Sequence, residues 1–150
     1  RNNDGTTSWT TIDVPGARET FPYGIENNNI VGFYNNTSDS GHHGFLYDGT
    51  VWTTIDVPGA MNTILCGISG NKIVGYYWYV TDRYYGFIYD NVKKIYTTID
   101  VPGASGTFLR GINDNGSVVG TYYSNINGSI RGFLYDVPRP TQCRNWLLFD

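Results

Sequence analysis

Short segments rich in Thr, Ile, Val, Phe and Tyr fill most of the chain, and Gly, Pro and Asn residues separate them. In the first third of the chain such segments lie at residues 20–25, 30–34 and 44–48, with the sequences TFPYGI, IVGFY and GFLYD. β-Branched and aromatic residues favour pleated strands, whereas Pro and Gly favour the turns between them. No window shows apolar residues at sustained helical spacing. The pattern therefore predicts an all-β protein with almost no helix.

The segment TTIDVPGA occurs three times, each time after an aromatic residue. Its copies span residues 10–17, 53–60 and 97–104. The preceding aromatics Trp9, Trp52 and Tyr96 are 43 and 44 residues apart, a period typical of stacked supersecondary units. The sequence thus predicts one domain, 1–150, built of units at about 9–51, 52–95 and 96–145, with an extra strand at 146–150.

Each unit contains four candidate strands, which we call a, b, c and d. In the second unit they lie at residues 52–57, 63–68, 73–77 and 86–90. The d-to-a turn is short, whereas the Pro-Gly turn leads from a to the next b, so the expected sheet order is b-c-d-a. Radially repeated sheets of this size are β-propeller blades. A three-fold β-trefoil is the alternative, since three four-stranded units would also close within one chain.

The strand count leaves one strand without a place, because the chain holds three copies each of b, c and d but four of a. In the b-c-d-a order the strand at 9–14 has no sheet of its own, and an unpaired strand tends to pair with another chain. We therefore expect self-assembly through strand a, or else that the extra strand marks where a longer array was cut. The residues concerned are Trp9, Thr10, Thr11, Ile12, Asp13, Trp146 and Phe149.

The ordered motifs resemble a known family. The combination of TTIDVPGA, INDNGSVVG at 112–120 and GFLYD resembles the bacterial HAF-type "probable extracellular repeat" family, over about residues 9–136. The resemblance implies an extracellular, all-β, propeller-like repeat protein with no established activity. The segment 137–145 departs from the family pattern.

Composition and charge narrow the function. A net charge of −3 with scattered Lys and Arg residues argues against nucleic acid as a partner. No apolar run is long enough to span a bilayer. The abundance of Asn, Gly, Thr and Tyr is typical of secreted β proteins, so we expect an extracellular or cell-surface location. Glycosylation sequons begin at Asn35, Asn36, Asn115 and Asn127. Cys66 and Cys143 allow one disulfide bridge, or Cys66 is an ordinary strand residue.

Candidate catalytic groups are few. His42 and His43 cannot jointly hold a metal if they lie on a strand, and we expect them to be exposed loop residues. Two repeated series of Asp residues are interpreted as caps of local backbone donors rather than as a calcium site. They comprise Asp13, Asp56, Asp100 and Asp150, and Asp48, Asp90 and Asp136. No Gly-X-Ser-X-Gly elbow or paired-carboxylate motif is present in the sequence, so we predict no enzyme, no metal and no cofactor.

The loop between strands c and d of the second unit carries residues that the other units lack. Trp78, Tyr79, Arg83 and Tyr84 combine aromatic faces with a cation, which suits stacking on sugar rings or on a protein partner. The leading hypothesis is a non-enzymatic extracellular repeat protein with a structural role that assembles with copies of itself. The alternative is a lectin-like propeller module that binds surface glycans through these four residues. A propeller hydrolase is a third hypothesis, and it requires a clustered acidic site.

Overall fold

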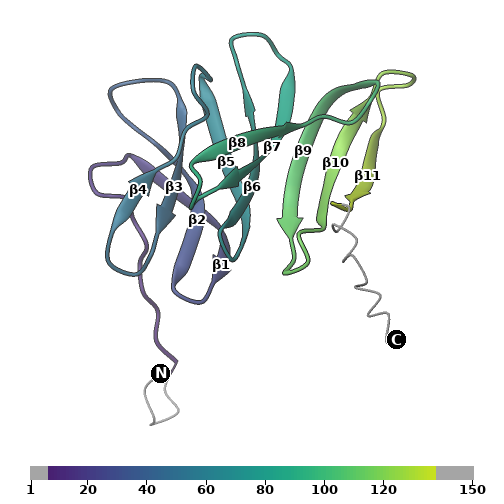
Figure 1. Cartoon of the computed structure of the whole chain (residues 1–150). Helices are drawn as coiled ribbons and strands as arrows, with labels where there is room; N and C mark the ends of the chain where they lie inside the picture. The colour runs from purple at the N-terminus through teal and green to yellow at the C-terminus, as the bar shows by residue number, and fades with distance from the viewer. Residues whose placement is uncertain (1–6, 138–150) are drawn as a thin grey trace, which may run out of the picture.

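The computed structural model describes residues 7–137, which form eleven β-strands and no helix (Figure 1). The all-β prediction is therefore confirmed. The strands are β1 (Glu19–Glu26), β2 (Asn29–Asn35), β3 (His42–Tyr47), β4 (Trp52–Thr54), β5 (Asn62–Ser69), β6 (Lys72–Trp78), β7 (Tyr84–Asp90), β8 (Ile95–Ile99), β9 (Ala104–Ile112), β10 (Val118–Ser124) and β11 (Ile130–Tyr135). Within residues 7–137 nothing has the helical length and apolarity needed to cross a bilayer.

The strands form three antiparallel groups, which we call sheets 1, 2 and 3. Sheet 1 has the order β1-β2-β3-β4, sheet 2 the order β5-β6-β7-β8, and sheet 3 the order β9-β10-β11. The first two sheets thus have the expected b-c-d-a order. A single parallel bridge between Tyr84 and Gly106 links β7 of sheet 2 to β9 of sheet 3. Sheet 2 lies between the other two, and its first strand β5 contacts both β1 and β9 (Figure 1).

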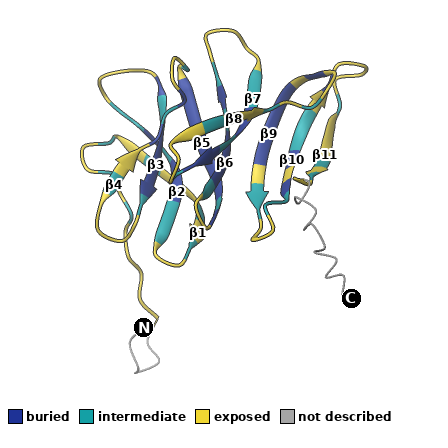
Figure 2. Ribbon diagram, viewed as in Figure 1, coloured by how far each residue is buried: buried dark blue, intermediate teal, exposed yellow. Residues whose placement is uncertain are grey.

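The hydrophobic core lies between the sheets rather than inside any one of them. One cluster joins sheets 1 and 2, with Val31 and Leu46 from the first sheet against Leu65 and Phe87 from the second. A second cluster joins Val74 of sheet 2 to Leu109 of sheet 3. Sheet 2, covered on both faces, is therefore the most buried part of the molecule, whereas exposed residues gather on the outer strands β1 and β11 (Figure 2).

The repeated VPGA residues form the same turn three times. In each copy the alanine N–H donates to the valine carbonyl, over 3.1 Å from Ala17, 3.0 Å from Ala60 and 3.0 Å from Ala104. The turn glycine has a positive φ in every copy, for example 77° at Gly59, which is the reason for glycine after proline in a type II turn. In the second and third copies this turn carries the chain from the last strand of one sheet to the first strand of the next, and the first copy leads into β1.

The segment 9–14 differs from its prediction as a strand. It contains no β-strand, and Trp9 is 94% exposed, because no neighbouring strand in residues 7–137 offers it a partner. Ile12 and Val14 are half-buried. The other predicted extra strand, with Trp146 and Phe149, lies outside the described residues.

Candidate functional site

The leading face of a sheet is the one that faces the next sheet along the chain. On this face a valine of the second strand occupies the same repeat position in all three sheets, as Val31, Val74 and Val119. Val31 and Val74 are 0% exposed because sheets 2 and 3 cover them, whereas Val119 is 51% exposed. The residue opposite Val119 on β11 is the exposed Leu134, and the exposed Ile130 lies further along the same face, opposite Tyr123. Sheet 3 therefore presents an apolar face of the kind that is covered elsewhere in the molecule.

A glycine in the third strand of each sheet makes room for the sheet that follows. A Cβ atom at Gly44 would lie 2.8 Å from Cγ of Leu65, and one at Gly86 would overlap Cδ1 of Leu109. Among residues 7–137, the equivalent Gly132 has only a backbone oxygen of Gly120 near its Cβ position, at 3.9 Å. The space beside this glycine, which we call the leucine seat, is thus filled by a leucine of the next sheet at Gly44 and Gly86, and no residue of 7–137 fills it at Gly132.

The opposite, trailing face of sheet 1 is also open. Leu65 and Leu109 are 0% exposed in the first strands of sheets 2 and 3, and the equivalent residue in β1 is the exposed Pro22. Ile25 on the same face is 70% exposed. The described residues thus end in two exposed apolar faces, one leading and one trailing. Inside the molecule, the equivalent residues of neighbouring sheets pack against each other.

The four residues predicted to bind a ligand divide between two faces of sheet 2. Trp78 and Tyr84 lie together, with ring centroids 5.1 Å apart, and both are half-buried. Tyr79 instead packs edge-on against Tyr85, and Arg83 lies over that same Tyr85 ring. The alternation of side chains along β6 and β7 separates the two pairs. The sequence identified the residues but not their distribution, which depends on where each strand begins and ends.

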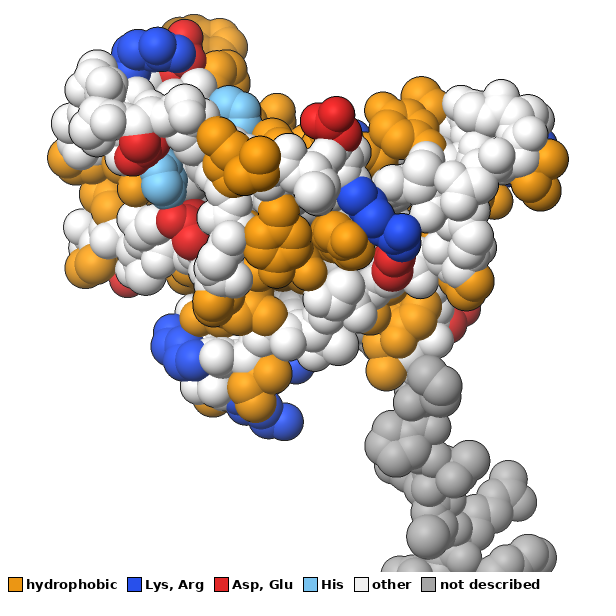
Figure 3. All heavy atoms as spheres, turned by 90° about the horizontal axis from the view of Figure 1, so that it is seen from above, with side chains coloured by type: hydrophobic (Ala, Val, Ile, Leu, Met, Phe, Trp, Pro, Cys, Tyr) orange, Lys and Arg blue, Asp and Glu red, His pale blue; other side chains and the backbone are white. Residues whose placement is uncertain are grey.

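Trp78 and Tyr84 belong to a larger row of aromatic rings, which the sequence did not predict. The Trp78 ring contacts His42 of sheet 1 at 5.6 Å, and Tyr84 contacts Phe108 of sheet 3 at 4.9 Å. The guanidinium of the exposed Arg110 lies over the Phe108 ring at 5.5 Å. The row comprises Phe21, Tyr23, Phe33, His42, Tyr76, Trp78, Tyr84, Phe108 and Tyr123. Hydrophobic side chains also gather across the middle of the molecule when it is seen from above (Figure 3).

The two histidines do not lie in an exposed loop, which corrects the sequence prediction. Both lie at the start of β3 and are half-buried, and they pair with Asn35 and Tyr34 of β2. His43 Nδ1 lies 2.7 Å from an Asp56 carboxylate oxygen, and Nε2 lies 3.2 Å from Asp39. Burial opposes the charged form of His43, but the two carboxylates outweigh it and raise its pKa above the ordinary 6.5. Burial, with His43 nearby, lowers the pKa of His42.

The repeated Asp residues have two different roles. Asp48 and Asp90 cap local turns, as predicted. Asp48 accepts from the N–H groups of the second and third residues after it, and Asp90 accepts from the equivalent two N–H groups and from the Lys72 ammonium. Lys72 and these N–H groups lower the pKa of Asp90. Asp56 and Asp100 instead bind groups of neighbouring strands, with Gly44 N–H donating to Asp56 and Arg83 donating to Asp100. The capping interpretation is therefore wrong for the second pair.

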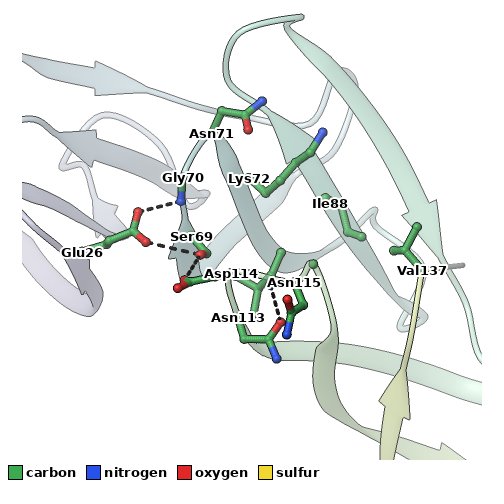
Figure 4. A pocket seen from close by; sticks show the side chains of 12 residues that line it. Glu26, Ser69, Gly70, Asn71, Lys72, Ile88, Asn113, Asp114, Asn115 and Val137 are labelled. Carbon is green, nitrogen blue, oxygen red and sulfur yellow. Dashed lines mark hydrogen bonds between the residues drawn. The ribbon is translucent and has the colours of Figure 1, made fainter. Parts of the chain in front are cut away.

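An open pocket of about 560 Å³, lined by polar and apolar side chains, lies where the first hairpin turns of the three sheets converge (Figure 4). Glu26 accepts a hydrogen bond from Gly70 N–H at 2.6 Å, and Ser69 Oγ lies 3.2 Å from Glu26 and 2.9 Å from Asp114. A serine hydroxyl has one proton and can donate to one of these two carboxylates at a time. No sequence pattern predicted this grouping, because Glu26 and Asp114 are not at equivalent repeat positions.

Cys66 is buried in β5, and burial raises the pKa of its thiol to about 11. Cys143 lies outside the described residues, so the predicted bridge stays a prediction. Within residues 7–137 no three His, Cys, Asp or Glu side chains are grouped so as to hold a metal ion.

Over residues 7–137 the fold and the site define an all-β protein of stacked antiparallel sheets, whose two end faces no described residue covers. No protein-family model matches the chain, and neither a curated protein nor a solved structure shows significant similarity to it. The resemblance to the HAF-type repeat family therefore remains a prediction from the sequence motifs.

Proposed function

We propose that this chain is a non-enzymatic, extracellular β-repeat module of the β-propeller type, with a structural role, and that it assembles with copies of itself. The observation that carries the proposal is the contrast at one repeat position, where Val31 and Val74 are fully buried and Val119 is half-exposed. An apolar face that is covered twice within the molecule is costly to leave in water the third time. Its extracellular location rests on composition and on the family resemblance.

The sheet arrangement supports the propeller type over the trefoil. All antiparallel pairing occurs within a sheet, and the first strands β1, β5 and β9 are neighbours in space. Radial blades share these features, because the sheets stack face to face with their first strands around an axis. A trefoil barrel would instead require antiparallel ladders between units.

Light scattering behind a sizing column tests the assembly. We expect a discrete mass corresponding to more than one chain over a tenfold range of protein concentration. A folded monomer at every concentration, with the circular dichroism of a β protein, would refute the proposal.

A lectin-like function is the second candidate, and the row of aromatic rings with Arg110 above it favours this function. Half-exposed rings beside a cation suit stacking on the apolar face of a sugar and hydrogen bonding to its hydroxyls. A glycan array would test it with the Trp78→Ala variant and, as a matched control, Tyr79→Ala on the other side of the strand. Binding that Trp78→Ala abolishes and Tyr79→Ala retains would support a lectin. Absence of binding by the unmodified protein would argue against one.

A further inference from the structure

The chain before sheet 1 already has the geometry of a connection between two sheets. Val14 N–H donates to Thr20 Oγ1 at 3.0 Å, and the equivalent bonds from Val57 and Val101 are also 3.0 Å long. In the latter two cases the residues before the valine belong to the preceding sheet. The shared turn therefore directs residues 9–13 away from sheet 1, toward the place of a preceding sheet.

Sheet 3 lacks a fourth strand within the described residues, whereas β4 and β8 supply that strand in sheets 1 and 2. The register of the existing pairs shows where the missing strand would lie. Leu46 is opposite Thr53 in sheet 1. The same register in sheet 3 places a TTID strand with its first Thr opposite Leu134 and its Asp opposite Arg131.

The side chains at this register are complementary in charge. In sheet 1 His43 pairs with Asp56. In sheet 2 the position equivalent to His43 holds Tyr85, and Asp100 pairs instead with Arg83, two residues earlier in the chain. Arg131 occupies the His43 position of sheet 3, and Asp13 occupies the Asp56 position of the first TTIDVPGA copy. Both side chains are exposed, and no ion pair involves either of them in residues 7–137.

A hydrogen bond between two hydroxyl groups recurs beside this pair. It joins the tyrosine at the end of the second strand to the second threonine of TTID. Tyr34 and Thr54 are hydrogen-bonded at 2.9 Å in sheet 1, and Tyr77 and Thr98 at 3.1 Å in sheet 2. Tyr122 is the equivalent tyrosine of sheet 3. The equivalent threonine is present in residues 9–13 as Thr11, whereas the segment 146–150 has Leu148 there. The hydroxyl chemistry therefore favours residues 9–13 as the strand beside β11.

We infer that a second copy of this chain closes the molecule head to tail. The trailing face of sheet 1 in one copy packs on the leading face of sheet 3 in the other, and residues 10–14 of the first copy extend the second copy's sheet 3 beside β11. The inference rests on the proposed self-assembly and names its surfaces. Pro22 of one copy packs over Gly132 of the other, in the way that Leu65 packs over Gly44 within the chain. A head-to-tail contact that closes forms a ring, and six is the only multiple of three sheets within the usual four to eight blades.

Cysteine cross-linking tests the strand pairing. In a background carrying Cys143→Ser, a Thr10→Cys variant is mixed with a Leu134→Cys variant and oxidised, because residues directly opposite in antiparallel strands are close enough for a disulfide. We expect a cross-linked product of two chains in the mixture. The control mixture replaces Leu134→Cys with Lys93→Cys, at an exposed turn of sheet 2, and should not cross-link. An intrachain cross-link in a Leu147→Cys, Leu134→Cys double variant, with no interchain product in the mixture, would overturn the inference.

Substitutions at the two faces test the contact without cross-linking. Arg131→Asp and Asp13→Arg should each raise the dimer dissociation constant about tenfold, since two interfaces each lose an ion pair and gain a like-charge pair. The double variant should restore it to within about threefold, and Lys93→Asp, with the same change of charge, should leave it unchanged. Gly132→Val has room in the single chain and should abolish the dimer while the fold persists.

The outcomes separate this inference from the proposed function. A discrete dimer that responds to these variants supports both. An oligomer whose mass and stability are unaffected by Arg131→Asp and Gly132→Val overturns the inference and leaves self-assembly standing. A monomeric unmodified protein overturns both.

Discussion

The valine that recurs on the leading face of each sheet allows one substitution to be made in two environments. Val74→Ala removes two methyl groups from a side chain that is 0% exposed between sheets 2 and 3. At about 0.8 kcal/mol per buried carbon, with a further contribution from the cavity left behind, we expect a loss of about 2 kcal/mol in the free energy of unfolding. Val119→Ala removes the same atoms from a side chain that is 51% exposed, and should cost less than about 0.5 kcal/mol.

Thermal unfolding followed by circular dichroism measures the difference. For a chain of this length about 2 kcal/mol corresponds to a decrease of about 4–8 °C in Tm for Val74→Ala, against 1–2 °C or less for Val119→Ala. The comparison is made at a protein concentration where light scattering shows single chains, so that assembly does not bury Val119. Equal losses of stability at the two positions under those conditions would refute the stacking of sheets 2 and 3. Val119 would then not differ from Val74 in being uncovered.

Two further predictions concern the same sheets. His43→Gln should lower Tm at pH 5.5, by an amount corresponding to about 1 kcal/mol or less since the His43–Asp56 pair is partly solvated, and the loss should shrink by pH 8.5. The sign follows from the raised pKa of His43: its stabilisation is fully present below the ordinary 6.5 and is lost as the pH rises through the folded-state value. A loss that grows with pH would contradict this account. In urea unfolding of single chains, Gly86→Ala should destabilise the protein by about 1–3 kcal/mol, because its Cβ overlaps Leu109, whereas Gly132→Ala should be nearly neutral. Equal losses of stability for the two glycine substitutions would show that the space beside Gly132 is occupied.

Local sequence was sufficient for the strands and their order within a sheet. Strand composition and the Pro-Gly turn depend on residues that are close together in the chain, so TTIDVPGA predicted both the a-to-b turn and the b-c-d-a order. The sequence also marked the segment 9–14 as a strand without a sheet of its own. It could not show that this segment lacks strand structure, because a strand requires a partner.

The candidate site depended on contacts between distant residues. The sequence selected Trp78 and Tyr84 for their difference from the other units, but it did not show that their rings join a row that begins in sheet 1 and ends in sheet 3. The half-buried positions of the two histidines likewise accompany their pairing with β2. Such groupings are set by how whole sheets pack, which no local pattern records.

The sequence by itself determined that this is a repeated all-β chain, because strand propensity, turn chemistry and a period of 43 and 44 residues are local or periodic properties. Only the tertiary structure decided which faces are covered. Val31, Val74 and Val119 occupy one repeat position, and their exposure differs because sheets 2 and 3 cover the first two while no described residue covers the third. The burial of a side chain depends on the sheet that packs across from it. Similar repeats therefore form one buried middle sheet, whereas the outer face of each end sheet is exposed.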